Sequence, residues 1–175
     1  MVRYNSKKAA IKHYRPKIEI PRTQMEVIGE IVALLGLIVL VVIFFTYWGN
    51  IPDSVPMNFD ASGKPNEWGS KLSLQYFLLI PLALYILLTL IGRKPHLFNF
   101  SVKINKQNAE KLYSIAIKYI LFMKAILAWM FVYIFYAIFQ VSLGLSDRMG
   151  WGAWVFLIAI FVSLAVFFIV SYKNR

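Results

Sequence analysis

The sequence predicts an all-α integral membrane protein with four transmembrane helices and a structured extracytoplasmic loop between the first two helices. Three observations lead to this fold class. The 175 residues are 59% hydrophobic and only 15% charged, which leaves more apolar surface than a soluble chain of this length can bury. Four apolar runs are each long enough to cross a hydrocarbon core of about 30 Å as a helix. The basic residues gather on alternate segments between these runs.

The chain begins with a basic segment, residues 1–25, which we expect to be a cytoplasmic tail. Thr23 and Glu26 have the spacing of a capping box, so the first span, residues 26–48, should begin there. The tail has no short apolar core with a cleavage site, which is typical of a retained signal-anchor rather than a removable signal peptide.

The loop over residues 49–71 is predicted to be rigid. Its three prolines fix φ at three points, and Asp60 to Gly63 reads as a turn in which Gly63 takes positive φ. Short extended pieces over residues 55–59 and 64–68 are then placed to pair as a hairpin, with Phe59 and Trp68 packing back on the membrane surface.

The remaining segments alternate between apolar spans and connections. After the loop come a second span (72–92), a basic cytoplasmic loop with an amphipathic elbow (93–118), a third span (119–142), an outer loop (143–150), a fourth span (151–172) and a short cytoplasmic tail (173–175). In the elbow, Leu112, Ile115 and Tyr119 share one helical face while Lys111 and Lys118 occupy another, which predicts a helix that lies on the inner leaflet and runs into the third span.

The distribution of lysine and arginine predicts the orientation. The first tail carries seven of these residues, the loop after the second span six and the last tail two, whereas the two other loops carry only Lys64, Lys71 and Arg148. Because basic loops stay on the cytoplasmic side, both termini should lie on the cytoplasmic side of the cell membrane and residues 49–71 on the outer side. Four of the five tryptophans, Trp48, Trp68, Trp151 and Trp154, fall at the predicted outer boundary, in agreement with this orientation.

Two features within the spans concern helix contacts. Small residues recur on one face of two spans, where another helix can approach closely: Gly29, Ala33 and Gly36 in the first, and Gly152, Ala159 and Ser163 in the fourth. Internal packing is the favoured interpretation and dimerisation the alternative. Glu30 and Lys124 lie a turn inside their spans at similar depth, so they either pair or extend separately to the interface.

The sequence shows no recognisable catalytic motif, and we expect no enzyme, no cofactor and no metal. It has no cysteine and only two histidines, far apart, and no nucleotide-binding, hydrolase or zinc-protease motif. The acids of the outer loop, Asp53, Asp60 and Glu67, do not have calcium-loop spacing. The net charge of +11 lies on the cytoplasmic segments, so the expected partner is the anionic inner leaflet of the lipid bilayer and not nucleic acid.

The outer loop resembles a known family in nine residues that stand between two spans: Pro52, Pro56, Asn58, Phe59, Asp60, Gly63, Pro65, Trp68 and Gly69. This pattern is similar to DUF1648, a domain of unknown function found in bacterial and archaeal multi-pass membrane proteins. It is also similar to the N-terminal part of SdpI-type immunity and signalling proteins, which act against a secreted bacterial toxin. Family members often carry histidine where this chain has Asn58, so a histidine ligand or pH sensor is not implied here.

The resemblance implies a membrane protein that senses, or gives immunity to, a secreted peptide or envelope stress through its outer loop. The alternative is an accessory or structural subunit that binds a membrane transporter or enzyme through its helices, with the loop as a docking cap. A small transporter or enzyme is the least favoured hypothesis, because the spans carry neither paired acids nor a nucleophile.

Overall fold

The computed structural model describes residues 15–175, so most of the predicted basic tail, residues 1–14, lies outside the described residues. The elements in chain order are α1 (Gln24–Trp48), β1 (Ser54–Phe59), β2 (Pro65–Ser70), α2 (Ser73–Gly92), the short 3-10 helix η1 (Pro95–Leu97), α3 (Ala109–Ser142) and α4 (Gly152–Lys173). Four of these helices are long and apolar enough to cross a membrane, and the two strands form a small hairpin between α1 and α2. The predicted fold class is confirmed.

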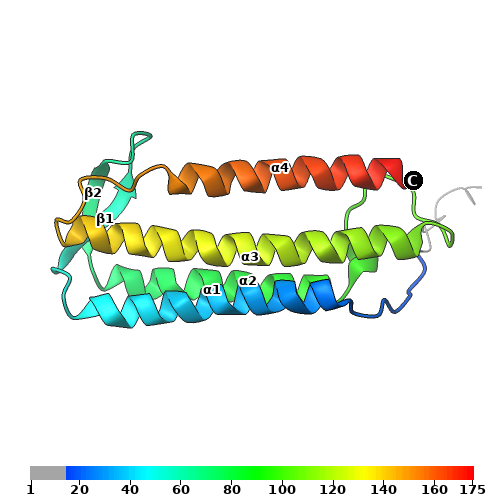
Figure 1. Cartoon of the computed structure of the whole chain (residues 1–175), viewed down its shortest axis with the longest axis horizontal. Helices are drawn as coiled ribbons and strands as arrows, with labels where there is room; N and C mark the ends of the chain where they lie inside the picture. The colour runs from blue at the N-terminus through cyan, green and yellow to red at the C-terminus, as the bar shows by residue number, and fades with distance from the viewer. Residues whose placement is uncertain (1–14) are drawn as a thin grey trace, which may run out of the picture.

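The four long helices run side by side, and α3 lies at the centre (Figure 1). Helix α3 packs against α1, α2 and α4, whereas α4 packs against no long helix except α3. The hairpin lies at one end of the molecule, here called the hairpin end. The first described residues and the C-terminus lie at the opposite end, called the tail end (Figure 1).

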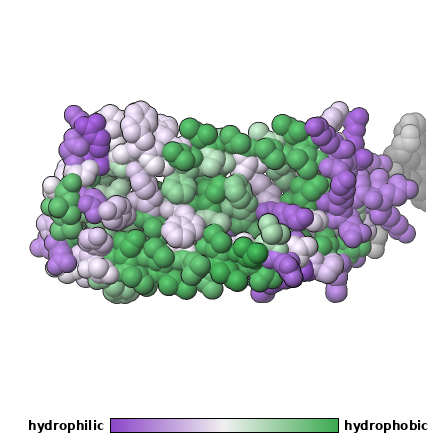
Figure 2. All heavy atoms as spheres, viewed as in Figure 1, coloured by the Kyte–Doolittle hydropathy of each residue, from purple (hydrophilic) through white to green (hydrophobic). Residues whose placement is uncertain are grey.

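Apolar side chains cover the outside of the helices. Large hydrophobic residues are exposed along α1, α2 and α4, among them Val42 and Phe45 on α1 and Phe161 on α4. On the face that Figure 2 shows, hydrophobic residues cover the middle of the molecule and hydrophilic residues gather at both ends. Water cannot stabilise such a band, so it faces lipid, and the chain is a multi-pass membrane protein.

The hairpin end has a tightly packed core. Ile51 and Val55, from the segment after α1, are buried among side chains of the three helices beneath them. The helical members of this core are Leu40, Phe44, Leu74, Val132, Phe135, Ile138 and Phe139. The hairpin is therefore seated in the bundle and is not a free loop.

Helix α1 begins as the capping box predicts. The Thr23 side chain accepts a hydrogen bond from the backbone N–H of Glu26 at 3.3 Å, and the Glu26 carboxylate accepts one from the Thr23 N–H at 3.2 Å. Both donors belong to the group that a helix start leaves without an intrahelical partner, so this exchange stabilises the first turn.

The amphipathic elbow, which the sequence predicts to run into the third span, forms the first part of α3. Residues 109–118 continue without a break into the span as one 34-residue helix. No proline or glycine interrupts the sequence between Asn108 and Ser142, so nothing ends the helix there. The apolar side chains Leu112 and Tyr113 are buried against Phe100 and Phe167 rather than against lipid.

The small residues of α1 face α3. Ala33 is fully buried, and a side chain at Gly36 would meet the Cβ of Ala128 at 2.9 Å, so the two backbones approach closely there. On α4, a side chain at Gly152 would meet the Tyr133 ring at 2.4 Å. The Ser163 hydroxyl lies 3.5 Å from the Met123 sulfur of α3, and Ala159 lines the same side of α4. The small residues of α1 and Gly152 of α4 thus pack closely on α3, whereas Ala159 and Ser163 line a groove between α3 and α4.

Candidate functional site

The hairpin contains an irregularity that explains Gly69, one of the nine residues of the family pattern (here called the signature residues). Its strands pair antiparallel, with Pro56 opposite Trp68 and Asn58 opposite Glu67, so Met57 is an extra residue on β1. The Met57 side chain lies across Gly69, where a Cβ would be only 2.7 Å from the Met57 Cγ. A larger residue at position 69 would therefore force the Met57 side chain out of its place on the bulge.

The turn of the hairpin is held by Asp60. Its Oδ1 accepts hydrogen bonds from the Ser62 N–H at 2.8 Å, the Ser62 hydroxyl at 2.7 Å and the Lys64 N–H at 3.0 Å. The Ser62 hydroxyl and then the Lys64 N–H lower the pKa of the Asp60 carboxyl below its ordinary value, because these bonds favour the carboxylate. Gly63 takes a φ of 81°, in the left-handed region that the sequence predicts.

At the base of the hairpin, a hydrogen bond and an ion pair join the residues that precede β1 and follow β2. Lys71 donates its backbone N–H to the Asp53 carbonyl at 2.9 Å, and its ammonium lies 2.9 Å from the Asp53 carboxylate. Next to this tie, Val55 and Pro56 are almost fully buried. The first strand thus anchors the hairpin to the core.

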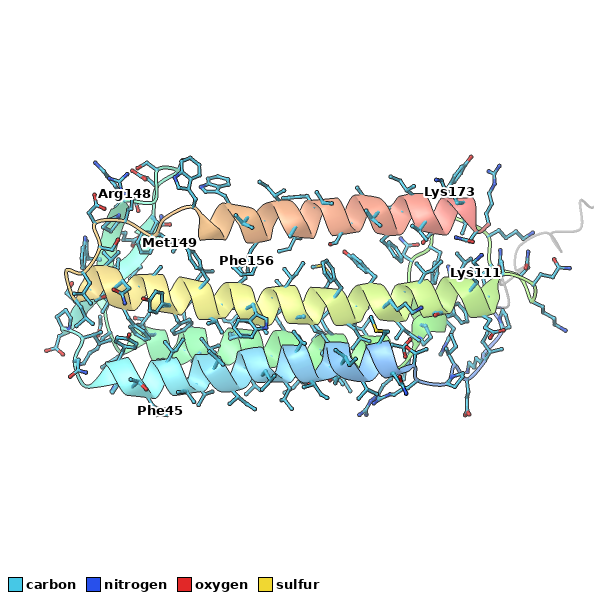
Figure 3. The ribbon with its side chains drawn as sticks, in the orientation of Figure 1. Phe45, Lys111, Arg148, Met149, Phe156 and Lys173 are labelled. Carbon is cyan, nitrogen blue, oxygen red and sulfur yellow. The ribbon has the colours of Figure 1, made fainter. Side chains whose placement is uncertain are left out.

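The tip of the hairpin is fastened to the loop between α3 and α4. The Met149 N–H donates to the Gly63 carbonyl at 2.7 Å, and the Tyr133 hydroxyl donates to the Met149 carbonyl. The same hydroxyl accepts a hydrogen bond from the Gly152 N–H at 3.1 Å. One tyrosine of α3 therefore joins the hairpin tip, through Met149, to the start of α4; Figure 3 labels Met149 and its neighbour Arg148 at this end.

The second strand, β2, is exposed and has one edge without a neighbouring strand. Asn66, Glu67 and Trp68 are all exposed, and Trp68 retains 51% of its accessible surface. The sheet has two strands, and no other backbone in the described part of the chain bonds to β2 within residues 65–70. On β1 and before it, Asn58 and Pro52 are also exposed.

The nine signature residues therefore divide into two groups. Some shape or seat the hairpin: Pro56, Phe59, Asp60, Gly63 and Gly69, with Pro65 paired to Phe59 across the strands. The others are exposed: Pro52, Asn58 and Trp68. The side-chain oxygen of Asn58 accepts a hydrogen bond from the Phe59 N–H at 3.0 Å.

The structure also brings Glu30 and Lys124 together, toward the tail end. The Lys124 ammonium lies 2.5 and 2.7 Å from the two Glu30 oxygens. Tyr85 of α2 completes the group: its hydroxyl donates to Glu30 at 2.6 Å, and the ammonium lies 4.0 Å from its ring centroid. Three helices thus share one polar contact inside the membrane span.

Sequence reasoning missed Tyr85, Tyr133 and Met149. Each lies in or beside an apolar run and has no local pattern that names its partner. For the two tyrosines the available signal was a phenol hydroxyl at buried depth, which needs a hydrogen-bond partner. Met149 gives no such signal, because it takes part through its backbone. No group of three or more histidine, cysteine, aspartate or glutamate side chains among residues 15–175 is placed to hold a metal ion.

A comparison with known protein families identifies part of the chain. The family model described as Domain of unknown function (DUF1648) matches residues 35–85, from the middle of α1 through the hairpin to the middle of α2. No match was found among curated proteins, and none among solved structures. The matched region includes the whole hairpin and the helix segments on which it is seated.

Proposed function

We propose that this multi-pass membrane protein, which carries a DUF1648 domain over residues 35–85, is a receptor for an extended peptide on the extracytoplasmic side. The hairpin end binds the peptide, and the chain thereby senses a secreted peptide or gives immunity to it. It acts by binding and not by catalysis.

The observation that carries this proposal is the free edge of β2 on a hairpin that is otherwise fixed. The turn, the base and the tip are each hydrogen-bonded, and β1 is seated in the core. An exposed strand edge presents unpaired N–H and C=O groups, which an incoming extended peptide can pair with as a third strand. Because the hairpin is already ordered, little conformational entropy is lost when the peptide binds.

The side chains of β2 indicate the chemistry of the peptide. Trp68 offers a large exposed aromatic surface, the kind of residue that dominates binding energy at interfaces. Glu67 is exposed and forms no ion pair with any residue in the described part of the chain. A peptide with a basic residue beside an apolar one fits this strand.

The test is protection of cells against secreted peptides. Cells lacking the gene are complemented with the wild-type chain, with Trp68→Ala or with Trp154→Ala, and are challenged with a panel of toxic peptides and envelope antibiotics. Trp68→Ala should lose protection, whereas Trp154→Ala, a change of the same size on the exposed side of α4, should keep it. Unchanged sensitivity of the gene deletion across the panel would reject the proposal.

A second experiment asks what β2 touches. A photo-crosslinking residue at Glu67 should capture added peptide in intact cells, and an excess of the unlabelled peptide should suppress the product. The same crosslinker at Lys103, in the loop at the tail end, should not capture it.

An accessory subunit is the second candidate function. The observation that favours it is the position of α4, which packs on α3 alone and exposes apolar residues such as Val155 and Phe161. In that case the crosslinker at Glu67 would capture a resident membrane protein without added peptide. Affinity capture in mild detergent that returns the chain by itself would exclude this alternative.

A further inference from the structure

A groove lies between α2 and α4 at the tail end of the molecule, where α4 ends beside the connection that follows α2 (Figure 1). Both helices pack against α3, and α4 packs against no long helix except α3, so α3 forms the floor of the groove. The groove has a volume of about 650 Å³. Its lining is mostly apolar and includes Leu90 and Ile91 of α2, Ile120 of α3, and Leu164 and Phe168 of α4.

Contacts within the chain hold the floor and the mouth of this groove in place. On the floor, the Tyr119 ring stacks on Phe167, with the ring centroids 4.7 Å apart. At the mouth, the Phe98 ring stacks on Phe100, and the Arg15 guanidinium donates a hydrogen bond to the Phe98 carbonyl. The groove is thus formed before a ligand arrives, so little conformational entropy is lost when the ligand binds.

The apolar part of the groove opens toward lipid. Leu90, Leu164 and Phe168 on its two walls are exposed, as are other large apolar residues of α2 and α4. Within the span, acyl chains are the molecules that surround such a surface, and they are as apolar as leucine itself. An acyl chain is therefore the ligand that fits the apolar part of the groove.

Lys94 supplies the polar end of the groove. Helix α2 ends at Gly92, so Lys94 lies just beyond the span, at the level of the lipid headgroups. Lys94 is exposed and forms no ion pair within residues 15–175. None of the described residues that line the groove is acidic, so the ammonium of a zwitterionic headgroup would find no carboxylate there. The charge of the groove therefore favours a headgroup that is negative overall.

We propose that this groove binds one molecule of an anionic phospholipid, with an acyl chain along the floor of the groove and the phosphate at the Lys94 ammonium. The site goes beyond the general attraction of a basic surface to an anionic leaflet, because it joins one cation to one preformed apolar groove. It lies at the tail end, away from the hairpin, and does not depend on the proposed peptide function (Figure 1).

The experiment compares lipids on the full chain by native mass spectrometry in detergent. Phosphatidylglycerol and phosphatidylcholine with identical acyl chains are titrated against the protein, and the affinity for the first bound molecule is measured. The attraction between one lysine and an anionic headgroup should make phosphatidylglycerol bind about fivefold tighter than phosphatidylcholine. Glycerol 3-phosphate, added in excess, should not displace phosphatidylglycerol, because it has no acyl chain to fill the groove.

Two variants, each with a matched control, locate the binding. Lys94→Gln should lose most of the preference for phosphatidylglycerol, whereas Lys106→Gln, which removes an exposed charge from the same connection outside the groove, should keep it. Leu164→Trp fills the groove and should weaken both lipids together. Ile158→Trp, an exposed change on α4 outside the groove, should leave both affinities unchanged.

Several results would overturn the proposal. Equal affinity of the wild-type chain for the two lipids would exclude a role for charge. An equal loss of preference in Lys94→Gln and Lys106→Gln would mean that diffuse charge attracts the lipid. Displacement by glycerol 3-phosphate would mean that the site takes a soluble phosphate compound.

Two further results concern what occupies the groove. A dimer that forms without lipid and is lost in Leu164→Trp would assign the groove to a second copy of the chain. Unchanged lipid affinity in Leu164→Trp would place the lipid elsewhere. Thermal unfolding of each variant in the same detergent shows whether it is folded, and Leu90→Trp, on the opposite wall, fills the same groove if Leu164→Trp does not fold.

Discussion

At the scale of single residues, the contact between Glu30 and Lys124 is unequal. The Lys124 side chain is 2% exposed, whereas the Glu30 side chain is 32% exposed and also lines a cavity of about 380 Å³ between α1, α2 and α3 at the tail end. Glu30 is therefore the partner that compensates the buried charge of Lys124. Glu30 itself is partly exposed and also accepts a hydrogen bond from the Tyr85 hydroxyl. Removing one partner of a buried pair leaves the other charge without compensation.

This inequality predicts different costs for the two single substitutions. Glu30→Gln should destabilise the fold by about 3–5 kcal/mol, because it leaves the buried ammonium unpaired. Lys124→Met should cost less, and the double variant should recover most of the loss. Equilibrium unfolding in mixed micelles measures these differences, with Glu110→Gln as a surface control. Equal costs for the two single variants would contradict this account.

Asp60 predicts a local response to pH. Its pKa in the folded hairpin lies below the ordinary value of about 3.9, so its contribution to stability is present above that pH and is lost as the pH falls through the folded pKa. Backbone amides of the turn should exchange hydrogen faster, relative to unstructured amides, below about pH 4. In Asp60→Asn this part of the pH dependence should disappear; a turn equally sensitive in both chains would count against the role of Asp60.

At the scale of elements, the hairpin depends on glycines for two different reasons. Gly69 leaves space for Met57, whereas Gly63 supplies a backbone conformation and a close contact, since a Cβ there would lie 3.3 Å from the Gly150 nitrogen. The hydrogen bond that joins the hairpin turn to the loop before α4 is accepted by the Gly63 carbonyl. The turn and the start of α4 should therefore loosen together.

Gly63→Ala tests this link. A left-handed conformation costs a residue with a Cβ about 1–2 kcal/mol, so the substitution should weaken the hydrogen bond from Met149 and speed exchange of that amide. Gly49→Ala is the matched control, because Gly49 has a φ of −73° and nothing within 4 Å of the added Cβ. If both variants left the Met149 amide equally protected, Gly63 would not hold the tip.

At the scale of the whole molecule, the sequence predicts most of the architecture and less of the contacts. The four spans were predictable because lipid leaves a chain no alternative to helices, and the hairpin because its prolines, Asp60 and Gly63 restrict the backbone locally. The helix that begins before the third span was predicted, but the residues that cover its apolar face were not, because amphipathic spacing at residues 112–119 is the same whether lipid or Phe100 and Phe167 cover that face. The bond from Tyr133 to the Met149 carbonyl was not predicted either, because no periodic pattern relates the two.

The orientation of the termini can be tested with single cysteines, because the chain has none of its own. Asn66→Cys on β2 should react with a membrane-impermeant maleimide in intact cells, since the basic residues predict that the hairpin lies outside. Lys103→Cys at the tail end should react only after permeabilisation. The reverse pattern would invert the predicted topology and place the hairpin in the cytoplasm.

The close packing of α1 on α3 limits how far a ligand could move between these two helices. Beyond Glu30 and Lys124, the buried Ala33 and the contact of Gly36 with Ala128 fill the space between these helices, and the core beneath the hairpin follows. The cavity at the tail end is lined by Glu30 and Lys124 but by neither Ala33 nor Gly36, so it ends at this ion pair. A ligand held there would find no path between α1 and α3 to the hairpin end.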